Sequence, residues 1–155
     1  MPGVLFVCTA NVCRSPMAEA LFADWLKRHA VPGRWWVGSA GTWAAQGAPA
    51  SAHAIEVLAE RGLDLSRHRA RQTHAGFITA HDLVLCMTRT HREALQAEFP
   101  AHAGRIKLLS EMIGKTFDIP DPYGGEREEY ARAAAELAHL IESGGQKIVE
   151  LAGWK

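Results

Sequence analysis

Short apolar runs alternate along this chain with longer segments that have helical periodicity. The runs lie at residues 4–7, 34–41, 81–87 and 105–109, and each predicts a buried strand. The segments at 15–30, 49–62, 89–99 and 126–143 predict helices, the first with Ser15 as its N-cap and Pro16 as its first helical residue. Such alternation is typical of a parallel sheet with helices on both faces. We therefore predict one three-layer α/β domain over residues 1–155, built on a four-stranded parallel sheet.

The composition of the chain argues against nucleic acid and membranes as binding partners. Seventeen basic and seventeen acidic side chains balance, so we expect no nucleic-acid binding. The apolar runs are too short to span a bilayer, and no basic leader precedes a long apolar stretch, so we expect a cytoplasmic protein with no membrane insertion. Three cysteines are too few for a disulfide framework, which fits a reducing compartment.

The first predicted strand leads directly into a loop and a helix start, in the sequence VLFVCTANVCRSPMAEA at residues 4–20. In open parallel sheets, ligands bind beyond the carboxyl ends of the strands. Loop N–H groups and the helix dipole attract an anion there, and the same field stabilises a thiolate at Cys8. Arg14 adds a planar pair of donors that matches two phosphate oxygens, and the hydroxyl of Ser15 can donate a hydrogen bond to the thiolate. The turn therefore predicts a phosphate site that faces a nucleophile.

Five motifs carry a resemblance to a known family. VCTANVCRSP (residues 7–16) resembles the phosphate-binding loop of the low-molecular-weight protein tyrosine phosphatases. SAGT (39–42), SRHRARQ (66–72), DLVLCMTRTH (82–91) and DPYGG (121–125) resemble later motifs of that family in the same order. The resemblance covers nearly the whole chain. It implies phosphomonoester hydrolysis through a phosphocysteine intermediate, with no metal and no other cofactor.

The resemblance also implies a role for each residue of the site. Cys8 would attack phosphorus in line, and the Arg14 guanidinium would hold the equatorial oxygens together with the loop. Asp121, directly before Pro-Tyr, would be the general acid, with Asp118 as the competing carboxylate. The phosphate-binding residues would be Thr9, Ala10, Asn11, Val12, Cys13, Arg14 and Ser15.

The loop needs support, because left-handed backbone is costly unless neighbouring groups hold it. Asn11 tolerates that conformation, whereas Ala10 stands where the family usually has glycine and requires a negative φ. The resemblance implies a hydrogen-bond network that joins Asn11 to Ser15, Ser39 and His68.

The cysteines leave alternatives open. Cys13 would form a reversible disulfide with Cys8 that protects the nucleophile from over-oxidation, or it simply fills space under the loop. Cys86, in the third predicted strand, is expected in the core. Arsenate reductases on the same fold use a cysteine in this region and another shortly after it. No cysteine follows Cys86 here, and the acid loop that they lack is present.

Substrate choice depends on the walls of the site. A family relative that dephosphorylates arginine carries threonine at the position of Val12, whereas the tyrosine-specific members carry an apolar β-branched residue. Val12 therefore favours phosphotyrosine over phosphoarginine. Aromatic walls suit a phenyl ring, and Val12, Trp43 and Tyr123 are the predicted substrate wall.

Two further expectations concern metals and partners. The eight histidines show no HExxH spacing, so we predict no metal site. Small bacterial members of the family often oppose a tyrosine kinase in polysaccharide export, so the resemblance implies a phosphotyrosine protein as substrate and such a kinase as partner. A phosphate-binding module without activity remains the alternative from another class. Such a module would use Arg14 but would not need both Cys8 and Asp121.

Overall fold

The computed structural model describes residues 1–153. In it, four short apolar segments form one parallel sheet. The strands are β1 (Gly3–Cys8), β2 (Trp36–Gly41), β3 (Leu83–Cys86) and β4 (Ile106–Leu108), in the order β2-β1-β3-β4. The central strand β1 pairs Val4 with Val37 of β2 and with Leu83 of β3. The predicted α/β class with a four-stranded parallel sheet is confirmed.

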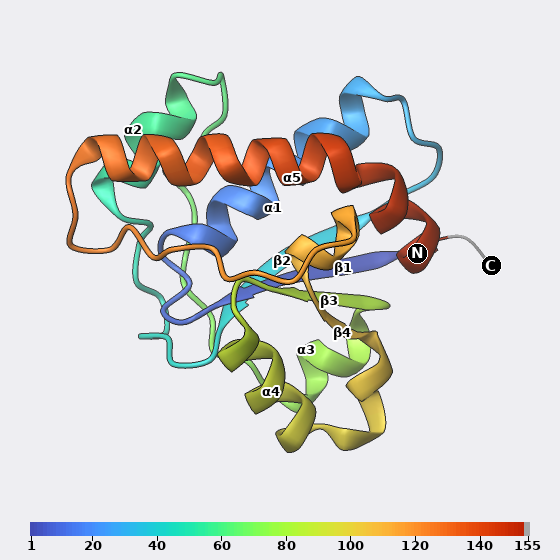
Figure 1. Ribbon diagram of the computed structural model, residues 1–155. Helices are drawn as coiled ribbons and strands as arrows, with labels where there is room; N and C mark the ends of the chain where they lie inside the picture. Colours follow the sequence, from blue (N-terminus) through green and yellow to red (C-terminus); the bar gives the residue numbers. More distant parts are fainter. Residues whose placement is uncertain (154–155) are drawn as a thin grey trace.

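Helices cover both faces of this sheet (Figure 1). One face carries α1 (Arg14–Arg28), α2 (Ala52–Ala59) and the long α5 (Arg127–Gly153). The other carries α3 (Ala75–Ala80) and α4 (Arg89–Glu98). Two short 3-10 helices, η1 (Pro100–Arg105) and η2 (Leu109–Ile113), flank β4.

Alternation along β1 divides the apolar interior into two clusters. Val4 and Phe6 face α1, α2 and α5, whereas Leu5 and Val7 face α3 and α4. All four side chains are fully buried. A strand buried on both faces reads as a continuous apolar run, and this is why the sequence predicts β1 so clearly.

Helix α5 extends ten residues beyond its predicted end. The sequence predicts a stop at residue 143, before the glycine pair Gly144 and Gly145, because glycine is a poor helix former. In the structure this pair faces the interior. A Cβ atom on Gly144 would lie 2.8 Å from the Cβ atom of Met112, and one on Gly145 would lie 2.6 Å from Cζ2 of Trp25. The pair therefore serves close packing of α5 on η2 and α1, which sequence periodicity does not reveal.

Two smaller differences concern helix starts. Helix α1 begins at Arg14, with Cys13 in the N-cap position, so Ser15 lies inside the first turn rather than at the cap. Its hydroxyl is used by the neighbouring loop instead. Helix α3, six residues long, was not predicted and has His74 as its N-cap, whose ring accepts a hydrogen bond from the Gly76 N–H.

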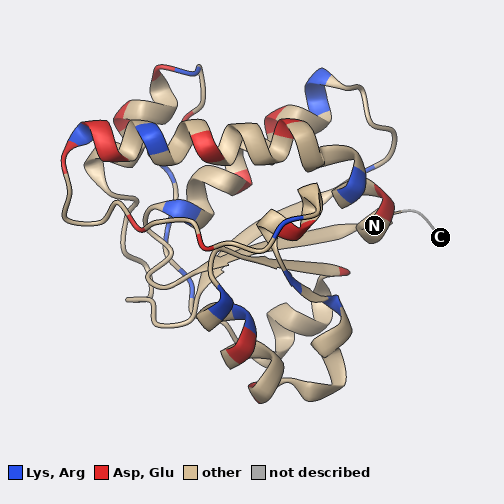
Figure 2. Cartoon of the chain, viewed as in Figure 1, with Lys and Arg blue, Asp and Glu red and all other residues tan. Residues whose placement is uncertain are grey.

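Charged residues of both signs are spread over the helices (Figure 2). Basic and acidic positions occur together along α5, in keeping with the formal net charge of zero. Among residues 1–153, no helix is both long and apolar enough to cross a membrane.

Candidate active site

The loop between β1 and α1 lies at the carboxyl end of the central strand (Figure 1). Cys8 is the last residue of β1, Arg14 is the first of α1, and both are buried. The end of β2 holds the loop from one side, because Trp43 N donates to the Thr9 carbonyl at 2.9 Å. Gly41 makes this approach possible. A Cβ atom there would lie 3.0 Å from Asn11 N and closer still to the Thr9 carbonyl oxygen.

Cys8 faces a hydroxyl that can stabilise its thiolate. Its Sγ lies 3.0 Å from Ser15 Oγ. The Asn11 amide donates to that same oxygen at 2.8 Å, so the hydroxyl can direct its own proton at the sulfur. The hydroxyl is therefore placed to donate a hydrogen bond to the sulfur.

Asn11 makes several of the hydrogen bonds that hold the loop between β1 and α1 in place. Its φ of 59° is left-handed, and its side chain is fully buried. Its Oδ1 accepts from Arg71 N at 2.9 Å, and its carbonyl oxygen lies 2.6 Å from Nε2 of His68. Burial lowers the pKa of His68. Among residues 1–153, Asn11 and Ala30 are the non-glycine residues with positive φ, so Ala10 keeps the negative φ that a methyl group requires.

Ser39 does not join this network. Its hydroxyl donates to Glu19 Oε1 at 2.6 Å, on the second turn of α1. The Ser39 carbonyl accepts from Arg71 Nη2 at 3.1 Å, and Arg71 N in turn donates to Asn11, so Arg71 bridges Ser39 to the loop. Sequence reasoning missed Arg71, whose link to Asn11 runs through a backbone N–H that no side-chain motif encodes.

The Arg14 guanidinium has partners for two of its nitrogens but not for the third. Its Nη1 donates to the Ile119 carbonyl at 2.9 Å, and its Nη2 lies 3.3 Å from Oδ2 of Asp121. Its Nε is buried and has no hydrogen-bond partner in the structure. A buried unpaired donor is costly unless a ligand supplies the acceptor. This geometry fits an anion such as a phosphate group beside Cys8.

The two candidate carboxylates have different surroundings. Asp121 faces Arg14, is 45% exposed at its side chain, and accepts from Tyr123 N at 3.1 Å. Asp118 instead accepts from Arg89 N at 2.8 Å and from Arg89 Nε at 3.2 Å. These hydrogen bonds lower the pKa of Asp118. Asp118 is thus engaged as an anchor of the segment at the start of α4, whereas Asp121 reaches the nucleophile's pocket.

A small pocket lies above the nucleophile. Its lining residues are Cys8, Ala10, Val12, Cys13, Arg14, Asp121 and Tyr123. Two of the three predicted wall residues, Val12 and Tyr123, therefore line it. Trp43 does not, and its side chain is 83% exposed. Trp43 contacts the loop through its backbone N–H, and its exposed ring is not part of this pocket.

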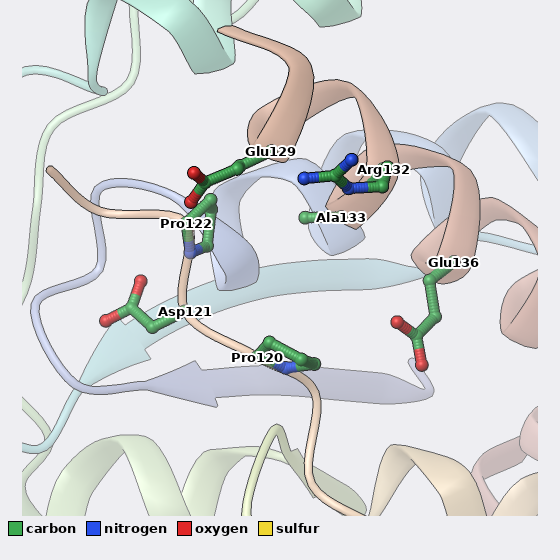
Figure 3. A pocket seen from close by; sticks show the side chains of 7 residues that line it. All are labelled: Pro120, Asp121, Pro122, Glu129, Arg132, Ala133 and Glu136. Atoms are coloured by element: carbon green, nitrogen blue, oxygen red, sulfur yellow. The ribbon is translucent and has the colours of Figure 1, made fainter. Parts of the chain in front are cut away.

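A larger pocket of about 260 Å³ lies on the other side of the acid segment, against the first half of α5 (Figure 3). Pro120, Asp121 and Pro122 form one wall, and Glu129, Arg132, Ala133 and Glu136 of α5 form the other. Asp121 lines both this pocket and the one above Cys8. The acid segment thus has open space on both sides.

The other two thiols differ in their access to the pocket. Cys13 lies with Sγ 3.1 Å from Ser51 Oγ and 3.6 Å from the Tyr130 hydroxyl, and burial raises its pKa. Cys86 lies in β3 with no exposed surface, and burial raises its pKa strongly. A thiol enclosed in the sheet cannot exchange disulfides with Cys8, so the structure speaks against the arsenate-reductase alternative.

One neighbour of the loop was missed by sequence reasoning. His91, in the first turn of α4, has Nε2 2.8 Å from Thr9 Oγ1 and Nδ1 3.0 Å from Thr88 Oγ1. It is buried, with 5% of its surface exposed. Its partner Thr9 is 82 positions away along the chain, and only the parallel pairing of β1 with β3 brings them together. Within residues 1–153, no group of three His, Cys, Asp or Glu side chains is arranged to hold a metal ion.

Comparisons with known proteins agree with this geometry. The family model described as "Low molecular weight phosphotyrosine protein phosphatase" matches residues 3–150. A probable low-molecular-weight protein-tyrosine-phosphatase of Ralstonia solanacearum, EpsP, is 38% identical over 140 residues, which are 90% of this chain and 91% of that protein. A protein-arginine-phosphatase of Geobacillus stearothermophilus is 40% identical over 146 residues, which are 94% and 95% of the two chains.

A solved structure shows the same fold. The crystal structure of a low-molecular-weight protein tyrosine phosphatase from T. tengcongensis superposes with a TM-score of 0.89 at 41% identity, and the match covers 95% of this chain and 99% of that one. The matched region includes the loop, the acid segment and all four strands. The chain is therefore an enzyme that belongs to the low-molecular-weight phosphotyrosine protein phosphatase family.

Proposed function

We propose that this enzyme hydrolyses phosphotyrosine in proteins, with Cys8 as the nucleophile. The observation that carries the proposal is the position of the Cys8 sulfur, 3.0 Å from the Ser15 hydroxyl at the carboxyl end of β1. The buried Arg14, with its unpaired Nε, lies in the same pocket. A non-enzymatic phosphate-binding module would not need an activated thiolate beside a carboxyl group.

The first step transfers the phosphoryl group to sulfur. The Cys8 thiolate attacks phosphorus in line, the S–P bond forms, and the bond between phosphorus and the phenolic oxygen breaks. Loop amides over residues 9–15 and the Arg14 guanidinium hold the three equatorial oxygens. When the phosphate takes over Arg14, the carboxylate of Asp121 is released from its ion pair and takes up a proton from solvent, which it then gives to the departing oxygen.

The second step regenerates the enzyme. Asp121 accepts a proton from a water molecule that attacks the phosphocysteine, and the S–P bond breaks to yield inorganic phosphate. The Ser15 hydroxyl then stabilises the Cys8 thiolate as the leaving group. The resident groups carry out both steps, so the mechanism uses no metal and no cofactor.

Substrate choice rests on Val12. The tyrosine and arginine phosphatases among the relatives are similarly close, at 38% and 40% identity, so identity does not separate the two substrates. Val12 lines the pocket beside Tyr123 and presents only methyl groups. An apolar wall suits a phenyl ring, whereas a guanidine group would leave its N–H donors unpaired there. We propose phosphotyrosine proteins as substrates, with a tyrosine kinase as the opposing partner, in the cytoplasm.

We also propose a protective disulfide. Cys8 and Cys13 line one pocket. Peroxide would oxidise the Cys8 thiolate to a sulfenic acid, and the Cys13 thiol would displace water to form the disulfide. Activity lost to excess peroxide should return with dithiothreitol in the wild type. In Cys13→Ser a second peroxide molecule would oxidise the sulfenic acid to the sulfinic acid, so activity should not return. Equal recovery in both would exclude this role.

The test of the proposed function is the pH–rate profile with p-nitrophenyl phosphate, in EDTA and reductant. We expect wild type to be active, Cys8→Ser to be inactive, and Asp121→Asn to be slower by about 10²- to 10⁴-fold. Asp118→Asn is the matched control, because the same change is made three residues away on a carboxylate that faces Arg89. Equal losses in the two Asn variants would refute the assignment of Asp121, and activity in Cys8→Ser would refute the nucleophile.

A further inference from the structure

His91 lies beside the carboxyl ends of β1 and β3, where the chain leaves these two paired strands toward opposite faces of the sheet. The loop after β1 leads to α1 on one face, whereas the chain after β3 leads to α4 on the other (Figure 1). Ligands in open α/β sheets bind at such a switch point. His91, in the first turn of α4, reaches across it to the Thr9 hydroxyl at 2.8 Å.

The ring is matched to neutral partners on both sides. A neutral imidazole has one N–H donor and one acceptor, and a threonine hydroxyl can complement either. Nε2 faces Thr9 Oγ1, and Nδ1 faces Thr88 Oγ1 at 3.0 Å. Thr88 Oγ1 also accepts the backbone N–H of His91 at 3.2 Å, which caps α4 and fixes the ring's own backbone.

The surroundings of the His91 ring oppose its protonation. Burial is the largest cause, and Arg14 adds to it, so the pKa of His91 falls to about 4. Asp121 and Asp118 act in the opposite direction without reversing the shift. The ring is therefore uncharged at neutral pH and serves as a fixed hydrogen-bonding group, not as a proton shuttle.

Thr9 is the first residue after the nucleophile, and it is held from two sides. Its carbonyl accepts from Trp43 N at the end of β2, at 2.9 Å, and its hydroxyl contacts His91 at the start of α4. The Trp43 contact holds the peptide group between Thr9 and Ala10, whereas the one between Cys8 and Thr9 is held by Thr42 N, which donates to the Cys8 carbonyl at 3.0 Å. The His91 contact fixes the Thr9 side chain between these two peptide groups. Deleting the His91 contact would leave the Thr9 side chain without this hydrogen bond and keep the two backbone contacts from the residues after β2.

We propose that His91 is a positioning residue for catalysis, which through the Thr9 hydroxyl holds Thr9, and with it the peptide groups on either side of Thr9, in the productive orientation of the phosphate-binding loop. This inference rests on the proposed function, in which that loop holds the transferred phosphoryl group. The same turn of α4 also anchors the acid segment, because Arg89 binds Asp118. One helix start therefore aligns the nucleophile's loop with the general acid's segment.

Two pairs of variants separate hydrogen bonding from packing. His91→Gln keeps a polar group near the position of Nε2 and can still reach Thr9. His91→Asn keeps a group only near Nδ1 and can reach only Thr88. On the other partner, Thr9→Ser keeps the hydroxyl and Thr9→Val removes it at nearly constant volume. His139→Gln, at an exposed site on α5, is the control.

The readouts are kcat and KM for p-nitrophenyl phosphate, the inhibition constant of inorganic phosphate, and the melting temperature. We expect His91→Asn and Thr9→Val to lower kcat and to weaken phosphate inhibition, each by about tenfold, the scale of one positioning hydrogen bond. The double variant should lose no more than either single variant. The control should stay within about twofold of wild type. His91→Gln should lose less than His91→Asn, and Thr9→Ser less than Thr9→Val, because each conservative variant keeps the hydrogen bond.

Two outcomes would overturn the inference. His91→Asn with an unchanged kcat but a lowered melting temperature would show that His91 only stabilises α4. Additive losses in the double variant would show that His91 and Thr9 act separately. If His91→Asn fails to fold, Thr9→Val still tests the contact from the other side. The affinity for inorganic phosphate does not require Cys8 to be the nucleophile, so failure of the proposed function would be seen separately.

Discussion

Replacing Gly145 by alanine should destabilise the enzyme although alanine is the better helix former. Gly145 lies inside α5, where this exchange alone would stabilise by about 1 kcal/mol. The new Cβ would lie 2.6 Å from Cζ2 and 2.8 Å from Cδ2 of Trp25, well inside contact distance. The indole cannot swing away, because it stacks on Phe22 at 6.0 Å and on His29 at 4.2 Å between ring centroids. Overpacking of this kind costs about 3 kcal/mol, so the net loss is about 2 kcal/mol.

The assay is thermal unfolding followed by circular dichroism. For a chain of this size a loss of about 2 kcal/mol lowers the melting temperature by roughly 4–8 °C. Gly104→Ala in η1 is the matched control, since a Cβ there meets nothing within 4 Å, and we expect no loss. A Gly145→Ala variant as stable as wild type would refute the packing argument and leave helix propensity as the ruling effect.

Three further predictions concern pH, the acid segment and specificity. Folding holds the pKa of His91 at about 4, below its ordinary 6.5, and lowers those of His68 and His81, so the unfolded chain binds more protons. The free energy of unfolding in urea should therefore fall as pH drops from 6.5 to 4, and a flat profile would contradict this. Asp118→Ala should cost about 1 kcal/mol by urea unfolding, and lower kcat by less than Asp121→Asn does, because it frees the acid segment without removing the acid. Val12→Thr should raise the ratio of kcat/KM for phosphoarginine over phosphotyrosine peptides, and an unchanged ratio would exclude Val12 as the determinant.

Much of the fold could be predicted from patterns of contiguous residues. Strand β1 is buried on both faces, so its sequence is an unbroken apolar run that predicts a strand without any partner. The loop after it could be predicted because a strand, a short loop and a helix start are contiguous. By contrast, α3 is six residues long and has one buried side chain, Ile78, which is too little periodicity to detect. The end of α5 depends on Trp25 and Met112, which are remote in sequence.

In the site, too, residues of short motifs could be predicted, whereas contacts between residues remote in sequence could not. Cys8, Arg14 and Asp121 could be predicted because each belongs to a short motif, and they line one pocket. Ser39 was expected in the loop network on motif grounds, but its hydroxyl finds the Glu19 carboxylate, a stronger acceptor that no motif includes. Trp43 was expected in the wall, yet only its backbone contacts the loop.

The strand order explains why the contact of His91 with Thr9 could not be predicted from the sequence. With the order β2-β1-β3-β4, the strand that follows β2 in the chain lies on the opposite side of β1. Thr9 therefore meets the end of β2 on one side and the start of α4 on the other. A phosphate loop built from five linking residues has little stability of its own, so its geometry must come from these flanking elements. Substitutions at the first turn of α4 should then alter phosphate affinity although no residue of that turn lines the pocket above Cys8.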